Sequence, residues 1–230
     1  MILLISQNVH ILFHRQRRRN RRVELPQKQP RPPAAFVMLC GMAGKESEEQ
    51  TLSQRRQTVA ERLLDAYASY YDITQVDDGT GLKAMCACHM RDSQYVLVKK
   101  AELWAAESHE YLYLWSLDRL EQADVDQIFQ RVLEDGEPRV QPHSQHMYTY
   151  LTAVVLYDSA DPQGLDQLKK LKKRREFKLS LHGWMEFRIA AVDVSTVEIT
   201  ANRSGKAMEK DLKRMVERII TKHFGEEKNQ

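Results

Sequence analysis

The alternation of apolar and polar residues is clearest between Gln94 and Trp115, in the segment QYVLVKKAELWAAESHEYLYLW. Side chains of a strand point alternately to its two faces, so this segment predicts two neighbouring strands with a short polar break at residues 107–109. Aromatic residues occupy one face of the second strand and leucines the other: Tyr111, Tyr113 and Trp115, then Leu112 and Leu114. Because both faces are apolar, we expect this strand in the centre of a sheet.

Four amphipathic helices are expected along the chain, since apolar residues recur there at helical spacing. They are Ser53–Tyr71, a stripe from Val125 to Leu133, a helix that begins at Asp161-Pro162 and continues past Leu171, and Lys206–His223. Further strands are expected at 82–90, 147–157, 177–182, 186–194 and 197–201, and DDGTG at 77–81 predicts a turn. The pattern therefore predicts an α+β domain over residues 53–225 with a mainly antiparallel sheet.

The expected order helix, three strands, helix occurs twice, over residues 53–157 and 161–225. Two related halves that share a sheet are therefore a hypothesis, which a different strand order in the two halves would contradict. The residues expected in the core are Tyr113, Leu114, Val154, Ile189 and Ile219.

Residues 1–41 differ from the rest in composition. Eight basic residues, one acidic residue and four of the seven prolines lie here, so residues 42–230 carry a net charge of −4 although the whole chain carries +3. The body is therefore mildly acidic, and overall basicity is no argument for nucleic acid. We expect residues 1–41 to be a disordered leader, with the natural start at Met42; an arginine-rich arm that binds nucleic acid is the alternative.

Cysteine usage and hydropathy indicate the compartment. Three cysteines, Cys40, Cys86 and Cys88, do not make a disulfide framework and favour a reducing compartment. Apolar runs stay shorter than the 18 residues of a membrane span, and the order of the apolar start and arginine cluster is the reverse of a secretory signal. We therefore expect a cytoplasmic protein without a membrane span.

Metal and cofactor signals are weak. Cys86-Ala-Cys88-His89 offers soft ligands, but a zinc site needs a fourth ligand and a turn, so buried cysteines are the expectation. The loop pair His143 and His146 is expected to be solvated. P-loop, GxGxxG, GxSxG and HExxH motifs are absent from the sequence, and we expect no cofactor, no metal and no assigned catalytic residue.

A divergent metal-dependent nuclease is the alternative function, because helix, three antiparallel strands, helix, strand is also the core order of PD-(D/E)XK nucleases. Those enzymes hold Mg²⁺ on carboxylates of adjacent strands, with a lysine beside the acid. The candidate acids are Glu102, Glu107, Glu110, Asp193 and Glu198, with Lys99 or Lys100 as the lysine. Neither Glu110 nor Glu198 is followed two residues later by lysine, so the fold without activity is also open.

A basic run extends from Leu168 to Lys178. We expect its cations on the outer face of the third helix, where they could bind phosphate backbone or anionic lipid: Lys169, Lys170, Lys172, Lys173, Arg174 and Arg175. An exposed, acid-balanced helix is the favoured interpretation. The last helix opens with mixed charge, which argues against a double-stranded RNA-binding domain, so nucleic acid is an unfavoured partner but not an excluded one.

Large aromatic residues near strand ends mark the preferred ligand site. Glu107 and Glu110 are expected to flank the turn between two strands, with Trp104 before it and Trp184 at a related turn. Such aromatics beside carboxylates can form an acid-rimmed groove for a small ligand or peptide. The alternative is that both tryptophans only cap the core.

Two segments resemble an uncharacterised family of Firmicutes proteins: YVLVKKAELWAAESHEY (Tyr95–Tyr111) and FKLSLHGWMEFRIAAVDV with ANRSGK (Phe177–Lys206). The resemblance implies a bacterial cytoplasmic protein with a domain of unknown function, and it brings no catalytic residues. The sequence therefore favours a non-enzymatic binding or regulatory module.

Overall fold

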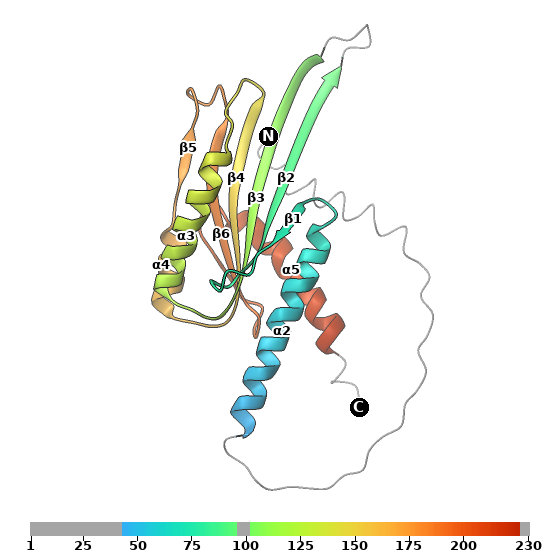
Figure 1. Cartoon of the computed structure of the whole chain (residues 1–230), viewed down its shortest axis with the longest axis vertical. Helices are drawn as coiled ribbons and strands as arrows, with labels where there is room; N and C mark the ends of the chain where they lie inside the picture. The colour runs from blue at the N-terminus through green and yellow to red at the C-terminus, as the bar shows by residue number, and fades with distance from the viewer. Residues whose placement is uncertain (1–42, 96–101, 226–230) are drawn as a thin grey trace, which may run out of the picture. The chain divides into compact units, whose positions relative to one another are not determined.

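The computed structural model describes residues 43–95 and 102–225, with side chains described for 51–91 and 106–225. These residues form four α-helices and seven strands (Figure 1): α2 Ala43–Tyr67, β1 Asp72–Gln75, β2 Leu82–Tyr95, β3 Glu102–Leu120, α3 Gln122–Gly136, β4 His146–Ala160, α4 Pro162–Lys170, β5 Arg174–Glu176, β6 Trp184–Asp193, β7 Ile199–Ala201 and α5 Lys206–Phe224. The chain divides into two compact units, 1–47 and 48–230, and the whole sheet belongs to the second. The predicted leader lies outside the described residues.

All seven strands form one mixed sheet in the order β1-β2-β3-β4-β6-β5, with β7 also paired to β6. The β3/β4 and β4/β6 pairs are parallel, and the other four pairs are antiparallel. Parallel neighbours need a crossover connection, and α3 and α4 provide it. The predicted α+β class with four helices and a mainly antiparallel sheet is confirmed.

Each face of the sheet is covered by a different pair of helices. Residues of α3 and α4 pack into one apolar cluster, and those of α2 and α5 pack into the other. Figure 1 shows α3 and α4 together on the side of β4 and β6. Among the predicted core residues, Tyr113, Leu114, Val154 and Ile189 are at most 1 % exposed, whereas Ile219 is only half-buried at the edge of the second cluster.

The predicted break at residues 107–109 is wrong, because β3 runs through it without interruption. Arg91 to Cys88 of β2 pair with Glu107 to Glu110 of β3, so hydrogen bonds to a neighbouring strand hold these polar residues in extended backbone. The expected strand at 94–100 lies largely outside the described residues.

The basic run is not one helix. The α4 helix ends at Lys170, and Arg174 and Arg175 instead form β5 on the edge of β6. Buried Leu171 caps the helix in a non-helical conformation, and its carbonyl accepts a hydrogen bond from Asn202 Nδ2 at 3.0 Å. The strand expected at 177–182 is also wrong: this segment is the turn between β5 and β6, with three residues at positive φ.

The two halves differ in how their strands pair. In the first half, β1 and β3 lie on opposite edges of β2. In the second half, β5 and β7 pair with different stretches of β6, whose other edge is occupied by β4. The strand order is therefore not repeated. Within the described part of the chain, no helix is long and apolar enough to cross a membrane.

Candidate functional site

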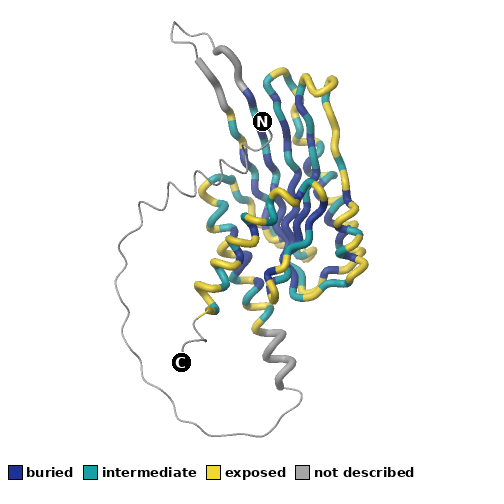
Figure 2. The backbone as a smooth tube through the Cα atoms, turned by 180° about the vertical axis from the view of Figure 1, so that it is seen from behind, coloured by how far each residue is buried: buried dark blue, intermediate teal, exposed yellow. Residues whose placement is uncertain are grey.

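Polar and aromatic side chains form a grid on the α2/α5 face of the sheet, toward the start of β4 and β6. The strand register places them in three rows: Ser108, Tyr148 and Trp184; Glu110, Tyr150 and Glu186; and Leu112, Thr152 and Arg188. We call the polar and aromatic members of this grid the aromatic–arginine face. Figure 2 shows α2 and α5 on the part of the sheet where β3, β4 and β6 end, away from the start of β4 and β6.

Glu110 is the buried anion of the aromatic–arginine face, and its side chain is held by two hydroxyl groups. Tyr71 Oη donates to Glu110 Oε2 at 2.8 Å, and Thr152 Oγ1 donates to Glu110 Oε1 at 2.6 Å. Burial, and then the nearby Glu110 charge, keep the pKa of Tyr71 well above its ordinary value, so the phenol remains a donor. Since Tyr71 follows α2, this contact joins the end of the helix to the sheet.

The neighbouring cysteines are buried and free, as predicted. Burial, and secondarily Glu110, raise the pKa of Cys86 to about 12 and that of Cys88 to about 11. Both thiols therefore stay protonated at neutral pH, whereas a nucleophile or zinc ligand must be a thiolate. Across the described residues, no group of three or more His, Cys, Asp or Glu side chains is arranged to hold a metal ion.

Arg188 is the cation of this face. Its guanidinium lies over the ring of Tyr150, 2.9 Å from the ring centroid, so the two side chains stack. Among the described residues, no carboxylate lies within ion-pair distance of Arg188. A half-buried guanidinium without a carboxylate retains its donors for an anion.

An aromatic wall continues from Tyr150 toward β6. The rings of Tyr148 and Tyr150 are 4.7 Å apart, and those of Tyr148 and Trp184 are 5.6 Å apart. Burial raises the pKa of Tyr148 to about 12, and Ser108 hydrogen-bonds to it. Trp184 Nε1 is buried, and it has no hydrogen-bond partner within the described part of the chain. The wall therefore contains a buried indole N–H without a partner among the described residues, four positions before Arg188 on β6.

The other charged pair on this side is internally balanced. Arg174 lies over the Trp184 ring at 4.9 Å and contacts Glu186 at 3.3 Å. Ser204 Oγ, just before α5, donates to Glu186 at 2.6 Å. Glu186 is thus occupied by two partners, which leaves Arg188 as the group able to attract an anion.

Of the three predicted ligand-site residues whose side chains are described, the structure brings two together. Glu110 and Trp184 lie on the same face, two strands apart, with Tyr148 and Tyr150 between them. Glu107 lies inside β3 rather than at a turn, and it points to the opposite face because strand side chains alternate. The backbone of Trp104 pairs with Gln94, and its side chain lies outside the described residues.

A histidine cluster on the α3/α4 face was not predicted. His89 Nδ1 and His109 Nδ1 are 2.8 Å apart, the His109 ring stacks on His146 at 5.9 Å, and His143 Nε2 contacts Glu107 at 3.2 Å. Burial, followed by the neighbouring imidazoles, lowers the pKa of His109; burial also lowers the pKa of His146. The sequence alone could not predict this cluster, because the register between β2 and β3 is what makes His89 and His109 direct neighbours.

The predicted anion-binding residues divide into paired and unpaired cations. Lys169 contacts Asp166 at 3.0 Å, Lys173 contacts Glu137 at 3.1 Å, and Arg174 contacts Glu186 as above. Of the described carboxylates, none lies within ion-pair distance of Lys170, Lys172 or Arg175. The run is thus partly balanced by acids, but the exposed helix of the favoured interpretation ends at Lys170.

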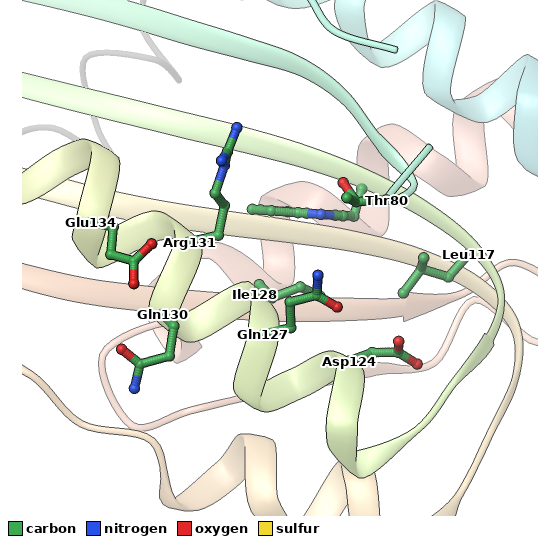
Figure 3. A pocket seen from close by; sticks show the side chains of 9 residues that line it. Thr80, Leu117, Asp124, Gln127, Ile128, Gln130, Arg131 and Glu134 are labelled. Atoms are coloured by element: carbon green, nitrogen blue, oxygen red, sulfur yellow. The ribbon is translucent and has the colours of Figure 1, made fainter. Parts of the chain in front are cut away.

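A hollow of about 300 Å³ lies between α3 and the sheet (Figure 3). Trp115 and Ile128 line its apolar part, and charged or amide side chains of α3 line the rest. Two of its three charged groups already have structural partners: Asp124 accepts from the Glu121 backbone N–H at 2.8 Å, and Arg131 lies 3.7 Å from Asp78. The aromatic–arginine face is the better candidate because its cation and its indole donor are not engaged in this way.

The nuclease hypothesis can be compared with the geometry of its acids. The expected core order is present as α2-β1-β2-β3-α3-β4. Glu110, however, is bonded to two hydroxyls, and Glu186 on the same row is separated from it by the whole of β4. Asp193 accepts hydrogen bonds from Ser195 and Thr196 in a turn, and Glu198 is exposed. Glu110 and Asp193 are thus already engaged by hydroxyl or backbone donors, which gives no support to a Mg²⁺ site on these acids.

Comparison with known families gives a match to the model described as "Domain of unknown function (DUF8052)", over residues 55–214, which is more than half of the chain. The match begins inside α2 and ends inside α5, so it includes the entire sheet. The comparisons with curated proteins and with solved structures gave no match. The family agrees with the expected domain of unknown function and says nothing about bacterial origin.

Proposed function

The chain belongs to the DUF8052 family, and from its own geometry we propose that it is a non-enzymatic binding protein whose aromatic–arginine face holds a small anionic ligand. Arg188 is the observation that carries the proposal. A half-buried guanidinium stacked on Tyr150, without a carboxylate partner among the described residues, is arranged to pair with an anion that arrives from solution.

The aromatic wall indicates the remainder of the ligand. Tyr150 and Trp184 are half-buried, so their rings leave some exposed surface beside Arg188 and Arg174 on which a planar group can pack. Trp184 Nε1 is buried, and an acceptor reaches it only when a neighbouring side chain moves aside. An unsatisfied buried N–H costs about 1–3 kcal/mol, so a ligand acceptor there would recover that free energy. A planar carboxylate or a phosphorylated aromatic compound carries both an anion for Arg188 and a flat group for the aromatic wall. The bacterial cytoplasm remains the proposed setting, and it rests on the sequence resemblance and the free thiols.

Binding is tested by calorimetry of the full chain with inorganic phosphate, benzoate and nucleoside monophosphates. We expect at least one aromatic anion to bind and to change the emission of Trp184, and we expect Trp184→Phe to remove that change. If none of the probes binds, or if the emission change persists in Trp184→Phe, the proposed face is wrong.

The Arg188→Gln variant measures how much the cation contributes to ligand affinity, separately from the aromatic wall. A hydrogen bond to a charged group contributes about 1.5–3 kcal/mol, so affinity should fall roughly tenfold to hundredfold. Arg218→Gln, an exposed arginine of α5, is the matched control and should bind as the parent does. Equal affinity of the Arg188 variant and its control would contradict the assignment of the anion site.

A divergent metal-dependent phosphodiesterase remains the second hypothesis, supported by the core order of the elements and by a buried carboxylate on β3. Hydrolysis of bis(p-nitrophenyl) phosphate with added Mg²⁺ or Mn²⁺ tests it. We expect no metal-stimulated hydrolysis. Activity that disappears in Glu110→Gln, with the variant still folded, would favour the enzyme over the binding protein.

A further inference from the structure

The turn between β5 and β6, residues 177–183, exposes two leucines at its tip. Leu179 is 94 % exposed and Leu181 is 76 % exposed, and among the described residues they are the two large apolar side chains that are exposed. Leucines are normally buried in a domain with two apolar cores, and scattered exposure would need no explanation. Two exposed leucines on one seven-residue turn do need an explanation.

The backbone of this turn is held in an unfavourable conformation. Lys178, Leu179 and Ser180 have φ values of 47°, 53° and 66°, a left-handed stretch that side chains with a Cβ rarely adopt. Backbone hydrogen bonds close the turn: His182 N donates to Phe177 O at 3.1 Å, and Leu181 N donates to Lys178 O at 3.0 Å. The turn that projects the leucines is therefore strained, and residues with strained backbone dihedrals cluster at functional sites.

The turn is anchored firmly to the sheet. Gly183 has a φ of 72°, and a Cβ there would lie 2.3 Å from Met147 O, so the backbone of the turn packs directly against β4. His146 Nδ1, also at the start of β4, lies 2.7 Å from His182 O. The leucines therefore project from a fixed base.

Positive charge lies in the turn and along the segment that leads into it. Lys178 lies in the turn itself, and Arg175 and Lys172 precede it; all three are exposed. Within the described part of the chain, no carboxylate lies within ion-pair distance of these three cations. Glu176, the nearest acid in sequence, is engaged by Arg174 at 3.4 Å. The tip is thus apolar, and its flank is cationic.

We propose that the 177–183 turn docks the protein on an anionic lipid bilayer, with Leu179 and Leu181 in the interface and Lys178, Arg175 and Lys172 at the headgroups. Apolar side chains and lysines act together at such a surface, since burial of the leucines adds to attraction by anionic lipid. A nucleic acid would use the cations but would gain little from two projecting leucines. The combination therefore favours lipid.

The test is flotation of the full chain with vesicles of phosphatidylcholine alone and with about 30 % phosphatidylglycerol. We expect binding to the anionic vesicles. The double change Leu179→Ser with Leu181→Ser should lower partitioning by about tenfold or more. All variants keep residues 1–41, so any contribution of that arginine-rich segment is the same in each comparison. Unchanged partitioning of the leucine variant would overturn the proposal.

Charge is tested separately with Lys178→Gln and Arg175→Gln, which should each lower partitioning on the order of fivefold. Lys210→Gln with Lys213→Gln, on exposed positions of α5, is the matched control and should bind as the parent does. Single-stranded RNA is the competing ligand. If the glutamine variants lose binding to RNA and vesicles while the leucine variant keeps both, the turn is a nucleic-acid site and the lipid assignment is wrong.

Insertion can be measured directly with Leu179→Trp in the full chain. Brominated lipids quench tryptophans that enter the bilayer interface, so this variant should lose more emission on vesicles than the parent does. Lys210→Trp is the control for an added tryptophan away from the turn. Equal quenching of both variants would show that the tip stays outside the bilayer and would overturn the proposal.

Discussion

Glu110 shows at the residue scale how one side chain acquires its environment from two distant parts of the chain. Its carboxylate accepts from Tyr71, which follows α2, and from Thr152 of β4. Buried carboxylates are stable only when such donors are present. Because two hydroxyl groups donate to it, Glu110 is a structural acceptor that links Tyr71 and Thr152 within the aromatic–arginine face.

Tyr71→Phe removes one of these donors without changing the ring. We expect the free energy of unfolding to fall by about 1.5–3 kcal/mol, because a buried carboxylate oxygen loses a charge-assisted hydrogen bond. Tyr70→Phe is the control, since the described residues provide no hydrogen bond to the Tyr70 hydroxyl. Urea denaturation measures both variants. Equal stabilities would mean that the Tyr71–Glu110 contact contributes nothing.

The histidine cluster predicts a pH dependence of stability. Burial and then the neighbouring imidazoles lower the folded-state pKa of His109 below its ordinary value of 6.5, so between these two pKa values the unfolded chain binds more protons. The contribution is therefore fully present above pH 6.5 and is lost as the pH falls below it. We expect the parent to lose more stability between pH 7.5 and pH 5 than His109→Gln loses.

Denaturation of both proteins at the two pH values checks this difference. His223→Gln, an exposed histidine of α5, should follow the parent, because its side chain lies outside the cluster. The same pH dependence in the parent and His109→Gln would exclude the cluster as the cause.

At the scale of elements, the β5–β6 turn is determined by its contact with β4. Gly183 and Gly79 both have positive φ, of 72° and 76°, but only Gly183 approaches another strand. A Cβ at Gly79 meets no atom within 4 Å, whereas one at Gly183 meets the carbonyl of Met147. The same substitution at the two positions therefore separates backbone strain from steric overlap.

Gly79→Ala should cost about 1 kcal/mol, because alanine disfavours positive φ. Gly183→Ala should cost about 3 kcal/mol or more, because β4 must also shift. Thermal denaturation of the two variants measures the difference. Similar losses would indicate that the turn adjusts without disturbing the sheet.

At the scale of the whole molecule, one sheet joins both halves of residues 48–230. Two apolar clusters lie on its two faces, and Leu114 of β3 is fully buried in the cluster under α2 and α5. Because the same cluster contains Val192 of β6 and Val216 of α5, a substitution at Leu114 should destabilise both halves.

Leu114→Asp should therefore lower the free energy of unfolding by about 4 kcal/mol or more, since it buries an unpaired charge. Circular dichroism and tryptophan fluorescence should report one shared transition at a lower temperature. Leu181→Asp makes the same chemical change at an exposed position and should shift stability by only about 0.5 kcal/mol. Two separate transitions in the parent would contradict the single cooperative unit.

Local periodicity was enough to predict the α+β class and the elements with strong patterns. The apolar stripes of α3 and α5 and the apolar runs of β4 and β6 lie where the sequence indicates them, because each pattern reports a face that the element itself must bury. The buried state of Cys86 and Cys88 followed from a different argument, the lack of the further ligand and the turn that a zinc site needs.

Tertiary pairing decided the features that no local pattern contains. The polar stretch 107–110 is strand because β2 and β4 supply its hydrogen bonds, and the basic run leaves α4 because the edge of β6 accepts β5. Pairing also decided the candidate site. Glu110 and Trp184 share a face although they are 74 positions apart in the sequence, and Glu107, only three residues from Glu110, faces the other side. Side-chain alternation within a strand is local, but which strands become neighbours depends on burial and hydrogen bonding across the whole sheet.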